Sequence, residues 1–136
     1  MAKVEMEIDS VRHKSLSDER VVILKAKGAK RYLPIYIGSH HADIIGRLLT
    51  HEGPVDSAYF DLSSSGYNLT FSDVESATVS RFTGNVFYSK LSLAYCGKSL
   101  EVDCPTAKAI ALAVRAEAPI FADEEVLSGA TIASPA

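Results

Sequence analysis

The stretch "DCPTAKAIALAVRAEAPIFADEEVL" (residues 103–127) decides the fold, because it carries a helix with almost no polar face. A strand end and a proline lead into this helix, predicted over residues 105–118, and a short apolar strand and a short acidic helix follow. Only Lys108 and Arg115 form a narrow polar stripe, so the helix is expected to be buried on more than one side. Such burial requires a sheet that wraps around the helix or a second subunit. We favour a homo-oligomer, a dimer or larger.

Upstream of this helix, hydrophobic periodicity predicts a single α+β domain over residues 1–136, with a flexible tail at 129–136. Each half of the chain shows three strands of a mixed or antiparallel sheet. The third strand of each half leads directly into a main helix, at residues 39–52 and 105–118. The repeated order indicates either duplication of a β-β-β-α unit or a coincidence of a common hairpin-rich pattern. A short further helix is expected from Pro54.

The first main helix has its own start and stop signals. Ser39 is predicted to cap its start and Gly53 to end it. Asp43 and Arg47 stand four residues apart, which places them on one face as an ion pair. Gly46 in mid-helix predicts a close backbone neighbour, since glycine there lowers helix stability.

The charge and hydropathy of the chain limit which partners it can bind. The net charge of −3 gives no general attraction for phosphate backbones, so nucleic-acid contact requires a local basic cluster. The densest basic run flanks an expected hairpin turn at Gly28 and is typical of a solvated turn; it comprises Lys25, Lys27, Lys30 and Arg31. Neither a signal peptide nor a membrane span is expected, which predicts a soluble, cytoplasmic protein.

Two cysteines flank an expected hairpin turn at Gly97. The strand geometry separates Cys96 from Cys104 by on the order of 17 Å, too far for a disulfide. Two reduced, partly buried thiols are therefore expected.

The candidate metal ligands gather at the two helix starts. His40 or His41 could ligate an ion together with Asp43, and Asp103 could join them if the second helix starts near the first. The alternatives are a solvated helix start for Asp43 and a helix cap for Asp103. Arg115 could hold a phosphate or form a surface ion pair. No nucleotide-binding or hydrolase motif occurs.

The segments "EMEIDSV", "VVILKAKGAKRYLPIYIG" and "AIALAVRAEAPIF" together resemble the bifunctional nuclease domain family over nearly the whole chain. The resemblance implies DNase and RNase activity with Mg²⁺ or Mn²⁺ as the metal. For such a nuclease we predict catalytic roles for Asp103, Asp43 and Arg115, and metal-ligand roles for Asp103, Asp43 and His40.

The polar positions depart from the family pattern. Where the family often has two acids around an alanine, this chain has His41, Ala42 and Asp43. A family Arg-Pro-x-Thr-His-Asp stretch falls on residues 53–58, where only the proline is kept. The acidic pair before Ala-Ile-Ala-Leu becomes Asp103 and Lys108.

Three functions follow from these patterns. The first is a divergent metal-dependent nuclease, and the second is a non-catalytic, homo-oligomeric binding or regulatory protein of the same fold. The third is a small-molecule binder that uses the face of Tyr32 and Tyr36.

Overall fold

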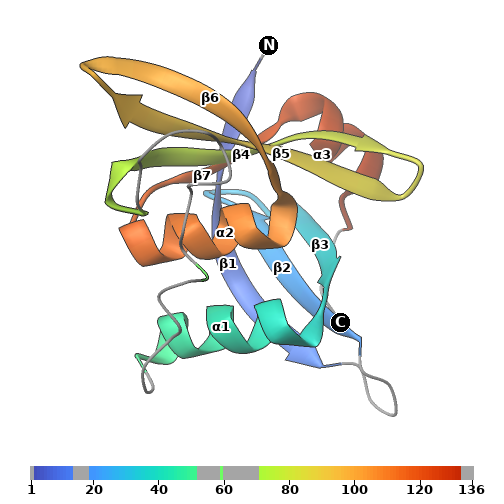
Figure 1. The fold of residues 1–136 in the computed structure, drawn as a ribbon. Helices are drawn as coiled ribbons and strands as arrows, with labels where there is room; N and C mark the ends of the chain where they lie inside the picture. Colours follow the sequence, from blue (N-terminus) through green and yellow to red (C-terminus); the bar gives the residue numbers. More distant parts are fainter. Residues whose placement is uncertain (1, 14–18, 52–58, 60–70, 133–136) are drawn as a thin grey trace.

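The computed structural model describes residues 2–13, 19–51, 59 and 71–132, which form a mixed seven-stranded sheet with three α-helices (Figure 1). The strands are β1 (Lys3–His13), β2 (Arg20–Ala26), β3 (Tyr32–Ile37), β4 (Val74–Thr83), β5 (Val86–Tyr95), β6 (Lys98–Pro105) and β7 (Ile120–Asp123). The helices are α1 (Ser39–Thr50), α2 (Thr106–Ala116) and α3 (Glu124–Ala130), and a 3-10 turn, η3 (Phe71–Asp73), precedes β4. The predicted α+β class is confirmed. The helix expected from Pro54 and the stop at Gly53 lie outside the described residues.

The two strand triplets lie on either side of β7. The sheet order is β3-β2-β1-β7-β4-β5-β6, so both triplets run outward from β7 in chain order. β7 pairs antiparallel with β1 and parallel with β4, which makes the sheet mixed. The predicted repeat of three strands and a helix therefore appears in space as two units that flank β7.

Helices α1 and α2 lie side by side and run in the same direction, so that their starts are neighbours (Figure 1). α2 packs against β4, β5 and β6 as well as α1. Its middle residues, including Ala111 and Leu112, have no exposed surface. The predicted burial of α2 on more than one side is confirmed, and the sheet and α1 of the same chain account for it.

The positions of β2 and β3 in the sheet agree with their residue composition. The apolar run "VVIL" (residues 21–24) lies in β2, between β1 and β3. β3 is an edge strand, where Pro34 is acceptable because its missing N–H removes no ladder hydrogen bond on the open side. Helix α3 begins with the predicted acidic turn and packs against β4, β7 and β3. Residues of the expected tail take part in this structure, because Ala130 ends α3 and Ile132 bridges to Tyr32.

Two details of α1 differ from the prediction. Its N-cap is Gly38, with no side-chain cap bond, and Ser39 is the first helical residue. Among the described residues, a Cβ at Gly46 would meet no atom within 4 Å beyond its own helix backbone and chain neighbours, so no close neighbour in this part of the chain explains the glycine. The Asp43–Arg47 ion pair is confirmed at 3.0 Å between Oδ2 and Nε. Within the described residues, no helix has the length and hydropathy of a membrane span.

Candidate functional site

Titratable side chains converge where α1 and α2 begin. His40 and His41 lie in the first turn of α1, with ring centroids 6.0 Å apart. Tyr59 approaches both rings edge-on, and its hydroxyl lies 2.7 Å from Nδ1 of His41 in a hydrogen bond. We call His40, His41, Tyr59, Cys104 and Lys108 the helix-start cluster.

The electrostatics of the cluster keep His41 neutral. Burial lowers the pKa of His41 from its ordinary 6.5, and the nearby charges of His40 and Lys108 lower it further. Burial, together with Cys104, raises the pKa of Tyr59 to about 12. At neutral pH the cluster therefore holds the uncharged imidazole of His41 and the protonated phenol of Tyr59.

Cys104 joins the cluster from the end of β6. Burial raises the pKa of its thiol to about 11, although the charge of Lys108 opposes the shift. A thiol of such high pKa is protonated at neutral pH and is a poor nucleophile. Both cysteines are free, as predicted, but Cys96 is exposed rather than partly buried.

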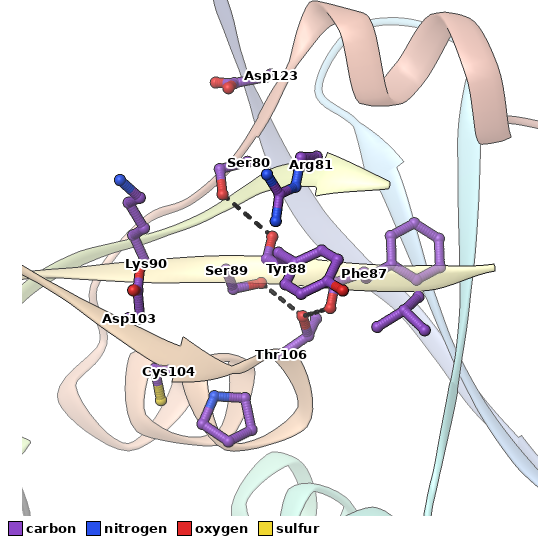
Figure 2. Close-up of a pocket in the computed structure, with 12 residues that line it drawn as sticks. Ser80, Arg81, Phe87, Tyr88, Ser89, Lys90, Asp103, Cys104, Thr106 and Asp123 are labelled. Carbon is purple, nitrogen blue, oxygen red and sulfur yellow. Dashed lines mark hydrogen bonds between the residues drawn. The ribbon is translucent and has the colours of Figure 1, made fainter. Parts of the chain in front are cut away.

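Asp103 lies on the other face of β6. Successive side chains of a strand point to opposite faces, so Asp103 and Cys104 diverge, as Figure 2 shows. Asp103 stands opposite Lys90 of β5 and lines a hollow of about 970 Å³ on the β4–β5–β6 surface. It does not cap α2, because Pro105 is the N-cap and no side chain bonds there.

Asp43 lies in a different hollow from Asp103. Its carboxylate is paired with Arg47, and both residues line a hollow of about 570 Å³ beside α1. Arg115 lies in the last turn of α2, two turns from Lys108. The part of the chain that the structure describes contains no group of three or more His, Cys, Asp or Glu side chains placed to hold a metal ion.

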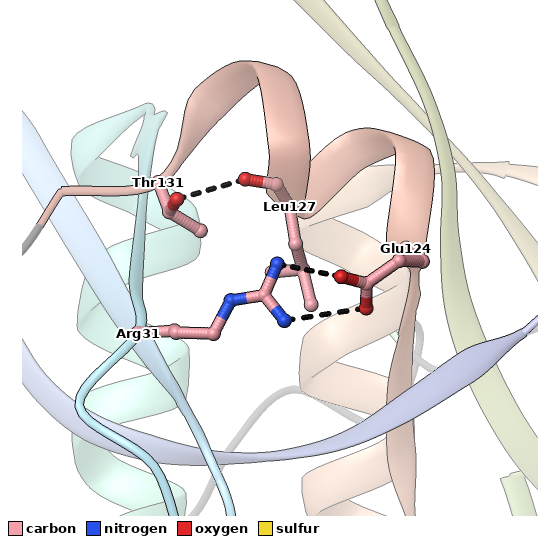
Figure 3. Close-up of polar contacts among 4 residues, drawn as sticks. All are labelled: Arg31, Glu124, Leu127 and Thr131. Carbon is pink, nitrogen blue, oxygen red and sulfur yellow. Dashed lines mark hydrogen bonds and ion pairs between the residues drawn. The ribbon is translucent and has the colours of Figure 1, made fainter.

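The basic run of the β2–β3 hairpin is neutralised by carboxylates. Lys27 lies 2.8 Å from Glu5, and the pKa of Lys27 is raised, chiefly by the hydrogen bond to that carboxylate. Arg31 binds Glu124 through both terminal nitrogens, at 2.9 and 3.3 Å (Figure 3). The hairpin therefore offers little net positive charge to a ligand.

Comparison with known families gives a match to the bifunctional nuclease domain, over residues 22–135. The chain belongs to the bifunctional nuclease domain family. A comparison with curated proteins finds no match. The fold brings His41 and Lys108, two positions where the resemblance led us to expect acids, close to each other at the helix starts.

Sequence reasoning identified His40 and His41 but missed the other members of the cluster. The alternation of β6 was the available signal for Cys104, because it puts only one of residues 103 and 104 on the helix face. Tyr59 gave no signal, since it stands in an irregular stretch of the sequence.

Proposed function

We propose that this protein cleaves phosphodiester bonds of nucleic acid at the helix-start cluster. The observation that carries the proposal is the position of His41, hydrogen-bonded to Tyr59 and within electrostatic reach of Lys108. A neutral imidazole can deprotonate a nucleophile, and an adjacent ammonium can stabilise charge on a phosphoryl oxygen. Membership of a family described as bifunctional nuclease supports the same substrate class.

The proposed reaction is hydrolysis. When Nδ1 of His41 donates its proton to the Tyr59 oxygen, Nε2 is left with a free lone pair. Nε2 takes a proton from the attacking water, whose oxygen forms a new bond to phosphorus. The bond between phosphorus and the leaving oxygen breaks, and that oxygen takes a proton from the protonated form of His40. Lys108 stabilises the negative charge that develops on the phosphoryl oxygens.

The described residues do not fit the metal that the resemblance implies. Mg²⁺ and Mn²⁺ need several oxygen ligands around one point. Asp43 is instead ion-paired with Arg47, and Asp103 points to the opposite side of β6 from Cys104, as Figure 2 shows. No step of the proposed reaction is therefore routed through a metal. In the competing mechanism the catalytic residues are Asp103, Asp43 and Arg115. Alanine substitution of these three residues distinguishes the two mechanisms.

The second candidate is a non-catalytic binding protein of the same fold. The replacement of two acids by His41 and Lys108 favours it, because this change converts a site suited to cations into one suited to anions. Its homo-oligomeric form finds support in exposed apolar side chains such as Tyr36 and Val86, which are 65% and 49% exposed. Light scattering after size-exclusion chromatography measures that oligomeric state.

The deciding experiment is a cleavage assay on end-labelled RNA and DNA oligonucleotides, in Mg²⁺, in Mn²⁺ and in chelator. His41→Gln is expected to slow cleavage by about 10²–10⁴-fold, the usual contribution of a general base. Lys108→Gln should slow it as well, whereas Lys98→Gln, an exposed lysine of the β5–β6 hairpin, should not. Asp103→Ala, Asp43→Ala and Arg115→Ala are expected to retain cleavage, including in chelator.

Each other result supports a different candidate. Chelator-sensitive cleavage that disappears in Asp103→Ala contradicts the proposal and restores the metal-dependent arrangement. Trace cleavage that is equal in all variants indicates a contaminant and leaves the non-catalytic binding protein. Circular dichroism of each variant checks that the fold is intact.

A further inference from the structure

Side chains of β5 and β6 form opposed pairs in the hollow of about 970 Å³ (Figure 2). In the β5–β6 ladder, Lys90 stands opposite Asp103, and Tyr88 stands opposite Pro105, the last residue of β6. Val86 precedes Tyr88 on β5 and therefore extends beyond the end of β6. Because side chains two residues apart on a strand share a face, Val86, Tyr88 and Lys90 point to the same side of the sheet. We call these five residues, which all line the hollow, the β5–β6 face.

Lys90 and Asp103 bring one charge of each sign to the β5–β6 face. Both residues are exposed. The ion pairs formed among the described residues involve neither of them, whereas Lys27, for example, is paired with Glu5. The β5–β6 face therefore presents a cation and a carboxylate, side by side, to a partner.

Apolar and aromatic surface adjoins these two charges. Val86 and Tyr88 are 49% and 43% exposed. The guanidinium of Arg81 lies 4.4 Å from the centre of the Tyr88 ring, and this cation–π contact holds the ring in place. An apolar and aromatic centre with charged residues around it is typical of protein–protein contacts.

We infer that the β5–β6 faces of two copies of this chain pack against each other and form a symmetric dimer. The two-fold axis runs parallel to the strands, between β5 and β6. It places each residue of β5 against the partner's residue that stands opposite it on β6, so Lys90 faces the partner's Asp103 and Asp103 faces the partner's Lys90. Tyr88 meets the partner's Pro105 in the same way, and Val86 reaches the hollow beyond the end of the partner's β6.

A second copy suits the β5–β6 face better than a nucleic acid does. The register of β5 with β6 makes this face complementary to itself, because Lys90 and Asp103 each meet the opposite charge. A phosphate backbone would instead meet the carboxylate of Asp103. Packing of two sheets with their strands within about 30° of each other is a common arrangement. The inference does not depend on the proposed function, since the association requires neither nucleic acid nor cleavage.

Size-exclusion chromatography with light scattering, over a concentration series, measures the dissociation constant of the dimer. A reductant prevents disulfides through the exposed Cys96. Lys90→Glu and Asp103→Lys should each raise the dissociation constant by about tenfold or more, because like charges then meet at two symmetric positions. The matched control is Lys98→Glu, which makes the same charge change at an exposed position of β6 outside the hollow. It should change the constant by less than about twofold.

The double variant Lys90→Glu/Asp103→Lys gives a sharper test. It keeps opposite charges across the β5–β6 ladder of each chain, so it should fold and form a dimer with itself. It should not pair with the wild type, because both charged contacts would then join like charges. The two single variants, mixed together, should by contrast form mixed dimers, since the new glutamate of one chain meets the new lysine of the other. Native mass spectrometry of mixtures in which one chain carries a mass tag counts the mixed dimers.

Each outcome supports or overturns the inference. A wild-type protein that stays monomeric over the concentration series overturns it, and so does a dimer that the charge changes leave intact. Mixed dimers of the double variant and the wild type at the statistical frequency also contradict the contact. If a single variant fails to fold by circular dichroism, the double variant still decides the question. A dimer with the expected pairing but without nuclease activity supports the inference and contradicts only the proposed function.

Discussion

Helices α1 and α2 follow equivalent strand triplets but have different surroundings. α1 lies on the outside of the helical layer, where Leu49 is 42% exposed and Asp43 and Arg47 reach solvent. α2 packs against α1, β4, β5 and β6, and its Leu112 is completely buried, whereas α1 meets the sheet mainly through β1 and β2. The outer helix can carry polar side chains along its length, whereas the inner helix carries them only at its ends. Candidate site residues are therefore found on the flank of α1 but only at the two ends of α2.

The largest expected difference between the helices concerns a leucine in each. Leu112→Ala leaves a cavity in the core and should lower the free energy of unfolding by about 2–5 kcal/mol. Leu49→Ala removes the same atoms from a partly exposed position and should cost less than about 1 kcal/mol. Urea denaturation of both variants measures the difference. Equal destabilisation would show that α2 is not the inner helix.

A smaller difference is expected for the hydroxyl residue that begins each helix. The Thr106 hydroxyl lies 2.7 Å from that of Ser89 and donates a bond of 3.1 Å to the Phe87 carbonyl, in a buried environment. Thr106→Val should therefore cost about 1–3 kcal/mol, because the Ser89 hydroxyl is left without this buried partner. Ser39→Ala should stay within about 0.5 kcal/mol, since α1 has no side-chain cap bond.

The matched double variant sharpens this second prediction. Replacing both buried hydroxyls, in Thr106→Val/Ser89→Ala, removes the unsatisfied group and should be less destabilising per hydroxyl than Thr106→Val alone. Thermal denaturation of the single and double variants checks this. Additive effects would mean that the two hydroxyls do not interact.

The smallest expected effect is the pH dependence that His41 contributes at the start of α1. Its pKa in the folded protein is below the ordinary 6.5, so between these values the unfolded chain binds more protons. The contribution of neutral His41 to the free energy of unfolding is fully present above pH 6.5 and is lost as the pH falls through the pKa of His41 in the folded protein. His41→Gln should lose less stability than the wild type between pH 7 and pH 5, as measured by urea denaturation. A wild-type protein that gains stability over this range, relative to His41→Gln, would contradict the assignment.

Much of the fold followed from the sequence because its elements are set by local periodicity. Two strand triplets, two main helices and the two-sided burial of the second helix were all predicted correctly. Cap positions were predicted less well. Ser39 was the expected N-cap of α1, but Gly38 is the N-cap. Because Gly38 has no side chain, no side-chain hydrogen bond marks this position in the sequence.

The candidate site was only partly predictable, because proximity at the helix starts depends on how the triplets are joined. The two helices begin next to each other since both triplets flank β7 and send their helices to the same side of the sheet. This arrangement selects Cys104 and Lys108 for the cluster and leaves Asp103 on the opposite face. It also places Arg12, Arg20 and Arg47 around one hollow, and it pairs Lys25, Lys27 and Arg31 with Glu7, Glu5 and Glu124.

The sequence by itself determined the elements, the family and the apolar core, since each depends on the identity and spacing of residues within short segments. Only the tertiary structure decided which polar side chains meet, because charges from separate strands either pair or gather when the sheet is assembled. For this protein the sheet order brings His41 to Lys108 and separates Asp43 from Asp103.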